Sequence, residues 1–322
     1  MKKYLSVSVL CLLLIVATAV CSAAATKKIA YLAPGLDLPF WRYLANGIEN
    51  HVKDLGLDAT VQVYDSKNDS SIQLQNAQDA IVKQVDVIII SPTDSSSCPA
   101  VLNAAEKAGI PAIIADVGTD SGKYAAFVIT PNEAGAKEVA DYLAKTMVEK
   151  KMTDRPAAQV TISLARNNGK ARSKGFTEAV EAVGVKVVDV RQLEKYTRAE
   201  AEGFAQDLMT AHQNLGAIFC HTDEPTLGVV KAVQSAGKDV LVIGFDATPE
   251  TIDAVRDGTL LAVAVQQPAF MGVKAVDAAV AIFEGKDVSE QVDVPTLLVT
   301  KDNINDKSIA DQLAANVFPD KK

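Results

Sequence analysis

The sequence predicts an α/β fold made of two doubly wound (Rossmann-like) lobes, each built on a parallel sheet. From residue 27 onward, apolar runs of strand length alternate with amphipathic stretches of helix length, a rhythm typical of parallel α/β chains. Most runs are apolar throughout, which indicates strands covered on both faces. The rhythm occurs twice within 322 residues, so we expect two lobes of similar plan.

The first series contains four strands and three helices. Gly56 follows the first helix and Gly109 the third, and glycine is common just past a helix end. The run Val-Ile-Ile-Ile is apolar throughout, as expected for a buried strand. Strands are expected at 29–33, 61–64, 87–90 and 112–115. Helices are expected at 41–55, 71–83 and 95–108.

The second series begins after the segment Thr-Pro-Asn at 130–132 and repeats the pattern. Helices are expected at 133–150, 171–183, 199–211 and 225–236. Strands are expected at 159–164, 186–190, 217–220 and 240–243. Further elements are expected at 258–266, 269–283 and 296–300, followed by a polar C-terminal tail.

Residues 1–25 have the pattern of a secretory signal peptide. A basic start is followed by an apolar run at 7–20 and by small residues that suit cleavage after Ala25. A membrane anchor is the alternative, but the run is shorter than the ~20 residues that a span needs. Lipidation of Cys21 is a second alternative, disfavoured by the large Val20 before it. We therefore expect a protein exported to a bacterial periplasm.

The charge and the cysteine content argue against nucleic-acid binding and against a disulfide scaffold. The chain has 32 Lys and Arg against 40 Asp and Glu, and without the signal peptide, which holds two Lys and no acid, 30 against 40, a net charge of −10. An acidic chain without a basic tract is a poor binder of nucleic acid. Only Cys98 and Cys220 remain after cleavage, too few for a disulfide scaffold. We expect two free thiols and a monomer.

Signatures of catalysis and metal binding are sparse. The sequence has no glycine-rich dinucleotide loop, no Walker-type loop and no Gly-x-Ser-x-Gly elbow. Its histidines, His51, His212 and His221, lack metal-ligand spacing. We expect no enzyme, no cofactor and no metal.

Polar and aromatic side chains follow the predicted strands, where open parallel sheets bind ligands. Acids, amides and rings of this kind suit a neutral polyhydroxylated compound, because carboxylates accept from hydroxyls and rings cover C–H faces. Other interpretations stay open. Asp116 and Asp223 are also placed to cap helices, Phe245 to lie in the core, and Arg166 and its basic neighbours to form a mostly solvated face with one member reaching a site.

Several motifs give the chain a family resemblance. It resembles the type I periplasmic sugar-binding proteins, most closely the ribose-binding group, over roughly residues 27–300. The resemblance rests on Pro39-Phe40-Trp41, Ser91-Pro92-Thr93-Asp94, Gly109-Ile110-Pro111, Arg172-x-x-Gly175-Phe176, Thr222-Asp223-Glu224-x-x-Leu227-Gly228 and Gly244-Phe245-Asp246-x-Thr248-Pro249.

The resemblance implies two lobes, 26–130 plus 267–294 and 131–266 plus 295–322, with three hinge crossings and a sugar between them. It implies that rings clamp the sugar and that polar side chains orient it, with Thr222 at a position where the ribose group has Asn. The implied ligand-binding residues are Phe40, Trp41, Asp116, Arg172, Tyr196, Thr222, Phe245, Asp246 and Gln266.

The chain departs from the ribose group at three first-lobe positions. Leu38 stands in place of Asn, Pro34 in place of a polar residue and Val117 in place of an Arg. An unpaired hydroxyl buried against an apolar side chain is penalised, so we expect a ligand other than ribose, such as a deoxysugar, a polyol or a furanose-type compound. Asp37 could restore part of the polarity.

The function that the resemblance implies is capture of this ligand and delivery to a membrane ABC permease. The alternative is a sensory role, in which the liganded form docks on a chemoreceptor or sensor kinase. A sugar-modifying enzyme is a third class. Ligand binding that bridges two lobes would favour the closed population in the first two cases.

Overall fold

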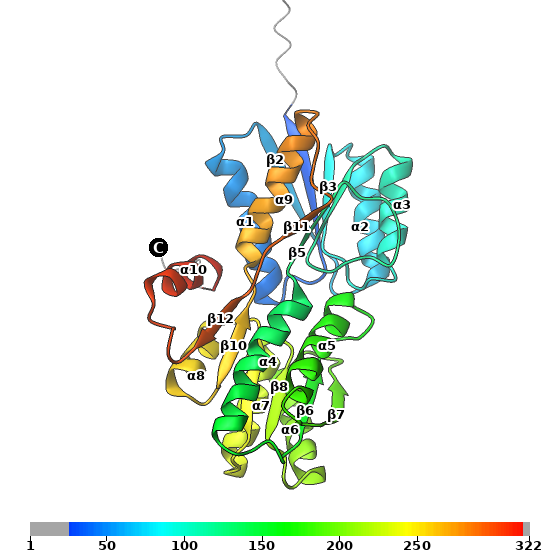
Figure 1. Cartoon of the computed structure of the whole chain (residues 1–322). Helices are drawn as coiled ribbons and strands as arrows, with labels where there is room; N and C mark the ends of the chain where they lie inside the picture. The colour runs from blue at the N-terminus through cyan, green and yellow to red at the C-terminus, as the bar shows by residue number, and fades with distance from the viewer. Residues whose placement is uncertain (1–25, 318–322) are drawn as a thin grey trace, which may run out of the picture.

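The computed structural model describes residues 26–317, so the predicted signal peptide lies outside the described residues. The described chain forms two lobes, one above the other in Figure 1, each with a six-stranded sheet between helices. This confirms the predicted fold class of two doubly wound lobes.

The first lobe is a fully parallel sheet with the strand order β11-β5-β4-β3-β1-β2. Helices α1 and α9 cover one face and α2 and α3 cover the other, which explains why the central strand β3 is apolar throughout. The strands are β1 (Lys27–Ala33), β2 (Ala59–Asp65), β3 (Val87–Ile90), β4 (Ala112–Ala115), β5 (Ala126–Ile129) and β11 (Gln291–Asp293). The helices are α1 (Pro39–Asp54), α2 (Ser70–Val82), α3 (Cys98–Lys107) and α9 (Pro268–Phe283).

The second lobe repeats this plan with the order β12-β10-β9-β8-β6-β7, in which only β12 is antiparallel to its neighbour. Helices α4 and α5 cover one face, and α6, α7 and α8 cover the other. The strands are β6 (Ala157–Thr161), β7 (Val187–Gln192), β8 (Ala217–Cys220), β9 (Leu241–Phe245), β10 (Ala262–Val265) and β12 (Leu297–Thr300). The helices are α4 (Asn132–Glu149), α5 (Asn167–Glu181), α6 (Arg198–Ala211), α7 (Asp223–Ala236) and α8 (Pro249–Asp257).

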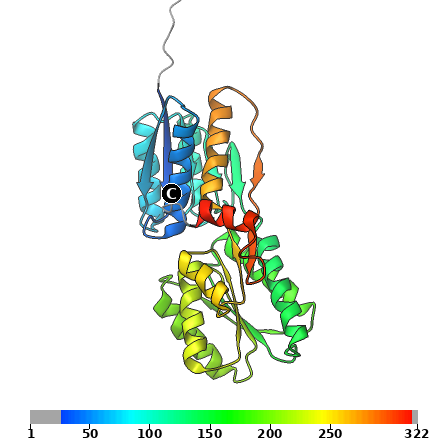
Figure 2. The same ribbon diagram turned by 90° about the vertical axis from the view of Figure 1, so that its left-hand side faces the viewer.

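The chain passes between the lobes three times: from β5 to α4, from β10 to α9 and from β11 to β12. Two of these crossings are tied together, because Nε2 of Gln267 donates to the carbonyl of Pro295 at 2.9 Å. The crossings lie side by side in the two views of Figures 1 and 2. They form a narrow connection between the two lobes.

Four elements differ from the sequence expectation. The expectation lacks β5, β11 and α8, because all three are short, β5 is only half buried and β11 is mostly exposed. The expected polar tail contains the helix α10 (Lys307–Asn316), which lies between the lobes in Figure 2. Leu313 and Val317 anchor it to the core of the second lobe, and Oδ1 of Asn316 accepts from the backbone N–H of Phe270 in α9.

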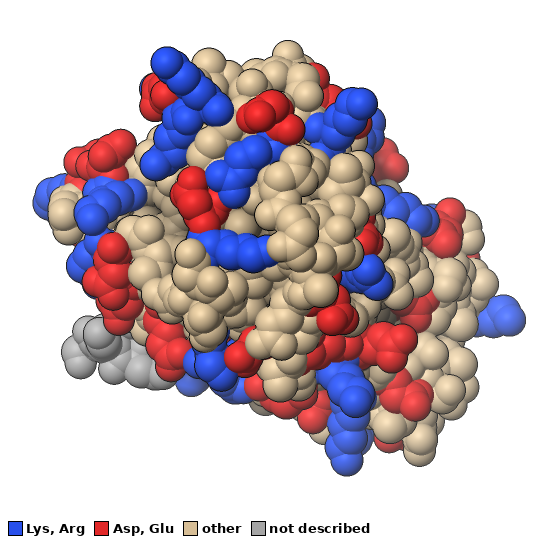
Figure 3. Space-filling model, turned by 90° about the horizontal axis from the view of Figure 1, so that it is seen from below, with Lys and Arg blue, Asp and Glu red and all other residues tan. Residues whose placement is uncertain are grey.

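The surface agrees with the mixed, acidic composition. On the face seen in Figure 3, basic and acidic side chains are interspersed rather than gathered by sign. Such a surface gives no broad positive field for a polyanion. Cys98 in α3 and Cys220 in β8 are both free and buried, in separate lobes.

Candidate functional site

A small cavity lies between the lobes, at the carboxyl ends of both parallel sheets, where open α/β sheets bind ligands. Both lobes and all but one of the nine predicted ligand-binding residues contribute to its wall. The lining residues are Leu38, Phe40, Trp41, Asp116, Ile162, Arg166, Asn168, Arg172, Tyr196, Thr222, Asp223, Asp246 and Gln266.

Two carboxylates occupy equivalent places in the two lobes. Asp116 directly follows β4 and Asp246 directly follows β9, and the backbone N–H of each bonds to a carbonyl of the next strand. Both residues adopt left-handed backbone, with φ of 70° and 66°. Aspartate tolerates this conformation better than most residues, and strained backbone of this kind gathers at functional sites. Both buried acids thus lie at the carboxyl ends of the strands in their sheets.

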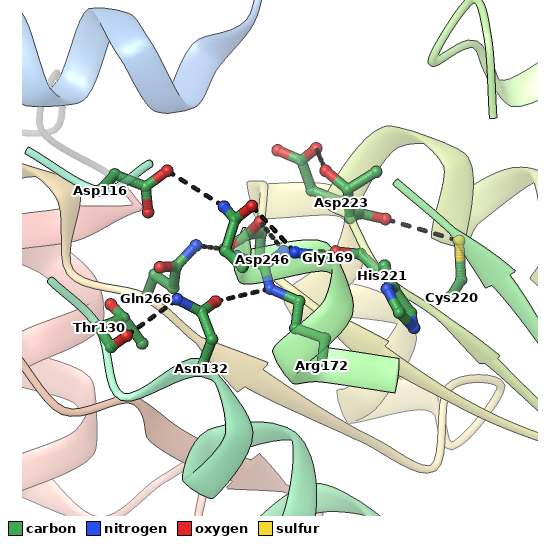
Figure 4. A network of polar contacts seen from close by, with 12 residues as sticks. Asp116, Thr130, Asn132, Gly169, Arg172, Cys220, His221, Asp223, Asp246 and Gln266 are labelled. Carbon is green, nitrogen blue, oxygen red and sulfur yellow. Dashed lines mark hydrogen bonds and ion pairs between the residues drawn. The ribbon is translucent and has the colours of Figure 1, made fainter. Parts of the chain in front are cut away.

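Arg172, near the start of α5, organises the wall of the second lobe (Figure 4). Its Nε donates to Oδ1 of Asn132 at 2.8 Å, and its Nη1 donates to the carbonyl of His221 at 2.6 Å and faces Oδ2 of Asp246 at 3.3 Å. Nε2 of Gln266 donates to the other Asp246 oxygen at 2.7 Å. This network of hydrogen bonds holds a guanidinium and a carboxylate in one fixed orientation.

Two acceptors at the cavity are left without partners. Oδ1 of Asp116 and Oε1 of Gln266 are buried and accept no hydrogen bond within the described protein, while Oδ2 of Asp116 accepts only a long bond of 3.4 Å from Asn168. A buried acceptor without a donor is costly. Ligand hydroxyl groups could supply the missing donors.

The electrostatics of the cavity follow from its burial. Desolvation raises the pKa of Asp116 to about 6, with Arg172 opposing and Asp246 adding to the rise. Burial, and secondarily the charge of Asp246, raises the pKa of Asp223 to about 7. Burial also raises the pKa of Asp246 against the opposing charge of Arg172. Three buried acids and two buried guanidinium groups thus line one small cavity.

The aromatic side of the cavity comes from the start of α1. Phe40 and Trp41 pack edge to face, with ring centroids 4.7 Å apart, and Pro39 in the first turn suits the helix start. Tyr196 lies opposite on the second lobe, with the Arg166 guanidinium 5.7 Å from its ring centroid. Rings on both sides could cover the apolar faces of a ligand.

One predicted residue takes a different position. Phe245 lies in the core of the second lobe, fully buried, and the guanidinium carbon of Arg172 sits 3.8 Å above its ring centroid. Its ring therefore packs against the Arg172 guanidinium and does not line the cavity. This happens because side chains alternate along a strand, so the residue before Asp246 points away from the strand-end position.

Five lining residues were not predicted as ligand-binding. Asp223 was open as a helix cap, but Thr222 is the N-cap of α7 and Asp223 occupies the first helical position. The expectation that Arg166 lies on a mostly solvated face is wrong, since it is 7% exposed. Arg166 and Asn168 follow β6, so the strand-end rule could have found them had the strand been ended at 161 rather than 164. Leu38 and Ile162 carry no polar signal.

No group of three or more His, Cys, Asp or Glu side chains within residues 26–317 is arranged to hold a metal ion. No helix in the same range combines the length and apolar character needed to cross a bilayer.

Comparison with known proteins identifies the family. A family model described as a periplasmic binding protein domain matches residues 29–287. The chain belongs to the type I periplasmic sugar-binding protein family. Within this family, it is 34% identical over 286 residues to the ribose import binding protein RbsB of Escherichia coli, a match covering 88% of this chain and 94% of that one. The D-allose-binding periplasmic protein of the same organism is 30% identical over 261 residues, covering 78% and 83%.

Solved structures of periplasmic sugar-binding proteins share the fold. A carbohydrate transporter solute-binding protein from Agrobacterium radiobacter in complex with D-arabinose matches with a TM-score of 0.82 and 26% identity, covering 90% of this chain and 99% of that one. The Caulobacter myo-inositol binding protein bound to myo-inositol matches with a TM-score of 0.80 and 26% identity, covering 90% and 98%. The family resemblance deduced from the sequence is confirmed.

Proposed function

We propose that this protein is a periplasmic solute-binding protein that encloses a monosaccharide or sugar-like ligand between its lobes and delivers it to an ABC importer. The observation that carries the proposal is the buried pair of unpaired acceptors, on Asp116 and Gln266, within a cavity walled by rings and a fixed guanidinium. Ligand hydroxyls would pair these oxygens, and the ring C–H groups would lie against Phe40 and Trp41.

The relatives support a ligand of this class. Their names and bound compounds include ribose, D-allose, D-arabinose and myo-inositol. All four are neutral, polyhydroxylated and small enough to be enclosed by two lobes. They differ in the positions of their hydroxyls, so the polarity of the cavity wall must decide among such ligands.

The wall of this cavity favours a ligand with one less polar face. Leu38 from the first lobe and Ile162 from the second both line it, and neither can pair a hydroxyl. Of the three departures from the ribose group, only Leu38 reaches the lining. Val117 is buried in the core of the first lobe, and Pro34, which directly follows β1, is buried as well. A deoxysugar, a polyol or a furanose-type compound remains our proposal.

The test is a ligand screen on residues 26–322, the chain without the predicted signal peptide. Trp41 is the only tryptophan and lines the cavity, so its emission reports binding there directly. We expect a saturable change with at least one member of a panel of pentoses, hexoses, deoxysugars and polyols, confirmed by calorimetry. Calorimetric binding of a sugar without any change in emission would place the ligand elsewhere, and binding of none would contradict the proposal.

A further inference from the structure

Three consecutive residues of the second lobe, Arg166, Asn167 and Asn168, donate hydrogen bonds to the first lobe at the start of α5. Nε of Arg166 donates to the carbonyl of Thr93 at 2.8 Å, and its Nη2 donates to Oδ1 of Asn68 at 2.9 Å. The backbone N–H of Asn167 donates to Oγ of Ser95 at 3.1 Å. All these partners belong to the first lobe, so the contacts exist only while the lobes are closed.

Arg166 is the dominant member of this group. Its side chain is buried at 7% exposure, and it lines the cavity while reaching past it to the first lobe. Both of its hydrogen bonds are charge-assisted and therefore stronger than those between neutral groups. Holding this long side chain costs conformational entropy. The side chain regains that entropy when the lobes separate and both hydrogen bonds break.

Both first-lobe partners of Arg166 are neutral, so a substitution can make these hydrogen bonds stronger or weaker. Among the ion pairs of residues 26–317, none joins Arg166 to a carboxylate within 4.0 Å. Its first-lobe partners are a carbonyl and an amide, both neutral. A carboxylate in place of the exposed Asn68 amide would turn the second bond into a partly buried ion pair and strengthen closure, whereas removal of the side chain would weaken it.

We propose that Arg166 is a positioning residue that latches the closed cleft through Asn68 and Thr93 and so sets how long a bound ligand is retained. The inference rests on the proposed function, because it concerns release from the same cavity. Most changes within one complex alter the dissociation rate more than the association rate. Because the Arg166 bonds form after the ligand is captured, we expect them to change its dissociation rate far more than its association rate.

Asn68 offers a test that leaves the cavity wall unchanged. It lies outside the lining residues, and its φ of 57° suits glycine and aspartate as well as asparagine. The variants are N68G, N68D and R166M, with stopped-flow Trp41 fluorescence as the readout. The probe is whichever of D-ribose, D-allose, D-fucose and myo-inositol binds most tightly.

We expect N68G and R166M to release the sugar roughly tenfold faster and N68D to release it several-fold more slowly, with association within about twofold for the Asn68 variants. In the R166M background, N68D should no longer slow release. Equal release rates for N68G, N68D and the parent protein would overturn the latch, as would a slowing by N68D that persists without Arg166.

Failure of the proposed function would be recognised separately. If no probe sugar binds, small-angle X-ray scattering of the unliganded protein decides the latch alone. A smaller radius of gyration for N68D than for N68G supports it. Identical scattering from the two variants overturns it.

Discussion

Nη1 of Arg172 lies 3.3 Å from Oδ2 of Asp246, with both side chains almost wholly excluded from solvent. The pair belongs entirely to the second lobe, where Asn132, Gln266 and the Phe245 ring complete its surroundings. On the first lobe, Asp116 has no such preformed partner. The second lobe therefore holds a preformed half-site, and the first lobe supplies the other half.

The buried pair makes Arg172 a structural residue as well as a binding residue. Removing one partner of a buried ion pair leaves the other charge unpaired, at a cost of about 3–5 kcal/mol. We expect R172M to lower the free energy of unfolding by about this amount, measured by urea denaturation. The matched control is R191M, whose pair with Asp189 is partly exposed and should cost about 1 kcal/mol or less. A value for R172M as small as that of the control would contradict the pair's role.

Asp116 is the cleaner probe of ligand binding. Substitution by Asn keeps the side-chain shape and removes the charge, and only a single long protein bond depends on the carboxylate. Hydrogen bonds to a charged group contribute about 1.5–3 kcal/mol, so we expect D116N to weaken sugar binding by roughly one to two orders of magnitude. Calorimetry gives the affinity, and circular dichroism should show an intact fold. Undiminished affinity would remove Asp116 from the site.

Asp223 gives binding a pH dependence of known sign. In the closed cleft its pKa is raised to about 7, whereas in an open, hydrated cleft it should return toward its ordinary value of 3.8. The closed form thus holds the proton more tightly, and closure takes up a proton between these values. The affinity of the parent protein relative to D223N should fall as pH rises toward 7 and level off above it. A ratio that is constant or rises over pH 5–7 would refute this linkage.

Leu38 lets the ligand preference be tested by restoring a polar group. It is the N-cap of α1 and makes no capping bond, so in L38N the amide oxygen should cap the helix while its NH₂ group faces the cavity. We expect a gain of about 0.5–1.5 kcal/mol in D-ribose binding, a two- to tenfold increase in affinity. Leu36 is packed in the first-lobe core, and L36N serves as the control. A gain in both variants, or in neither, would argue against a discriminating role for Leu38.

The ends of the strands could be located from the sequence, but the tertiary contacts of long side chains could not. Asp116 and Asp246 could be predicted because each directly follows an apolar run that the sheets bury. Arg166 was missed because a charged residue on a polar stretch is usually solvated, and its burial depends on the distant Thr93 and Asn68. Likewise, the position of Phe245 beneath Arg172 depends on packing between β9 and α5. Such pairings arise only from the folded tertiary structure.

The central claim is that a sugar-like ligand is enclosed between the two lobes. It is tested most directly by a crystal structure of residues 26–322 with the sugar that binds most tightly. We expect the sugar in the cavity, with a hydroxyl within hydrogen-bond distance of Oδ1 of Asp116, another near Oε1 of Gln266, and its apolar face against Phe40 and Trp41. A sugar bound elsewhere on the protein, with Asp116 and Gln266 still unpaired, would contradict the claim.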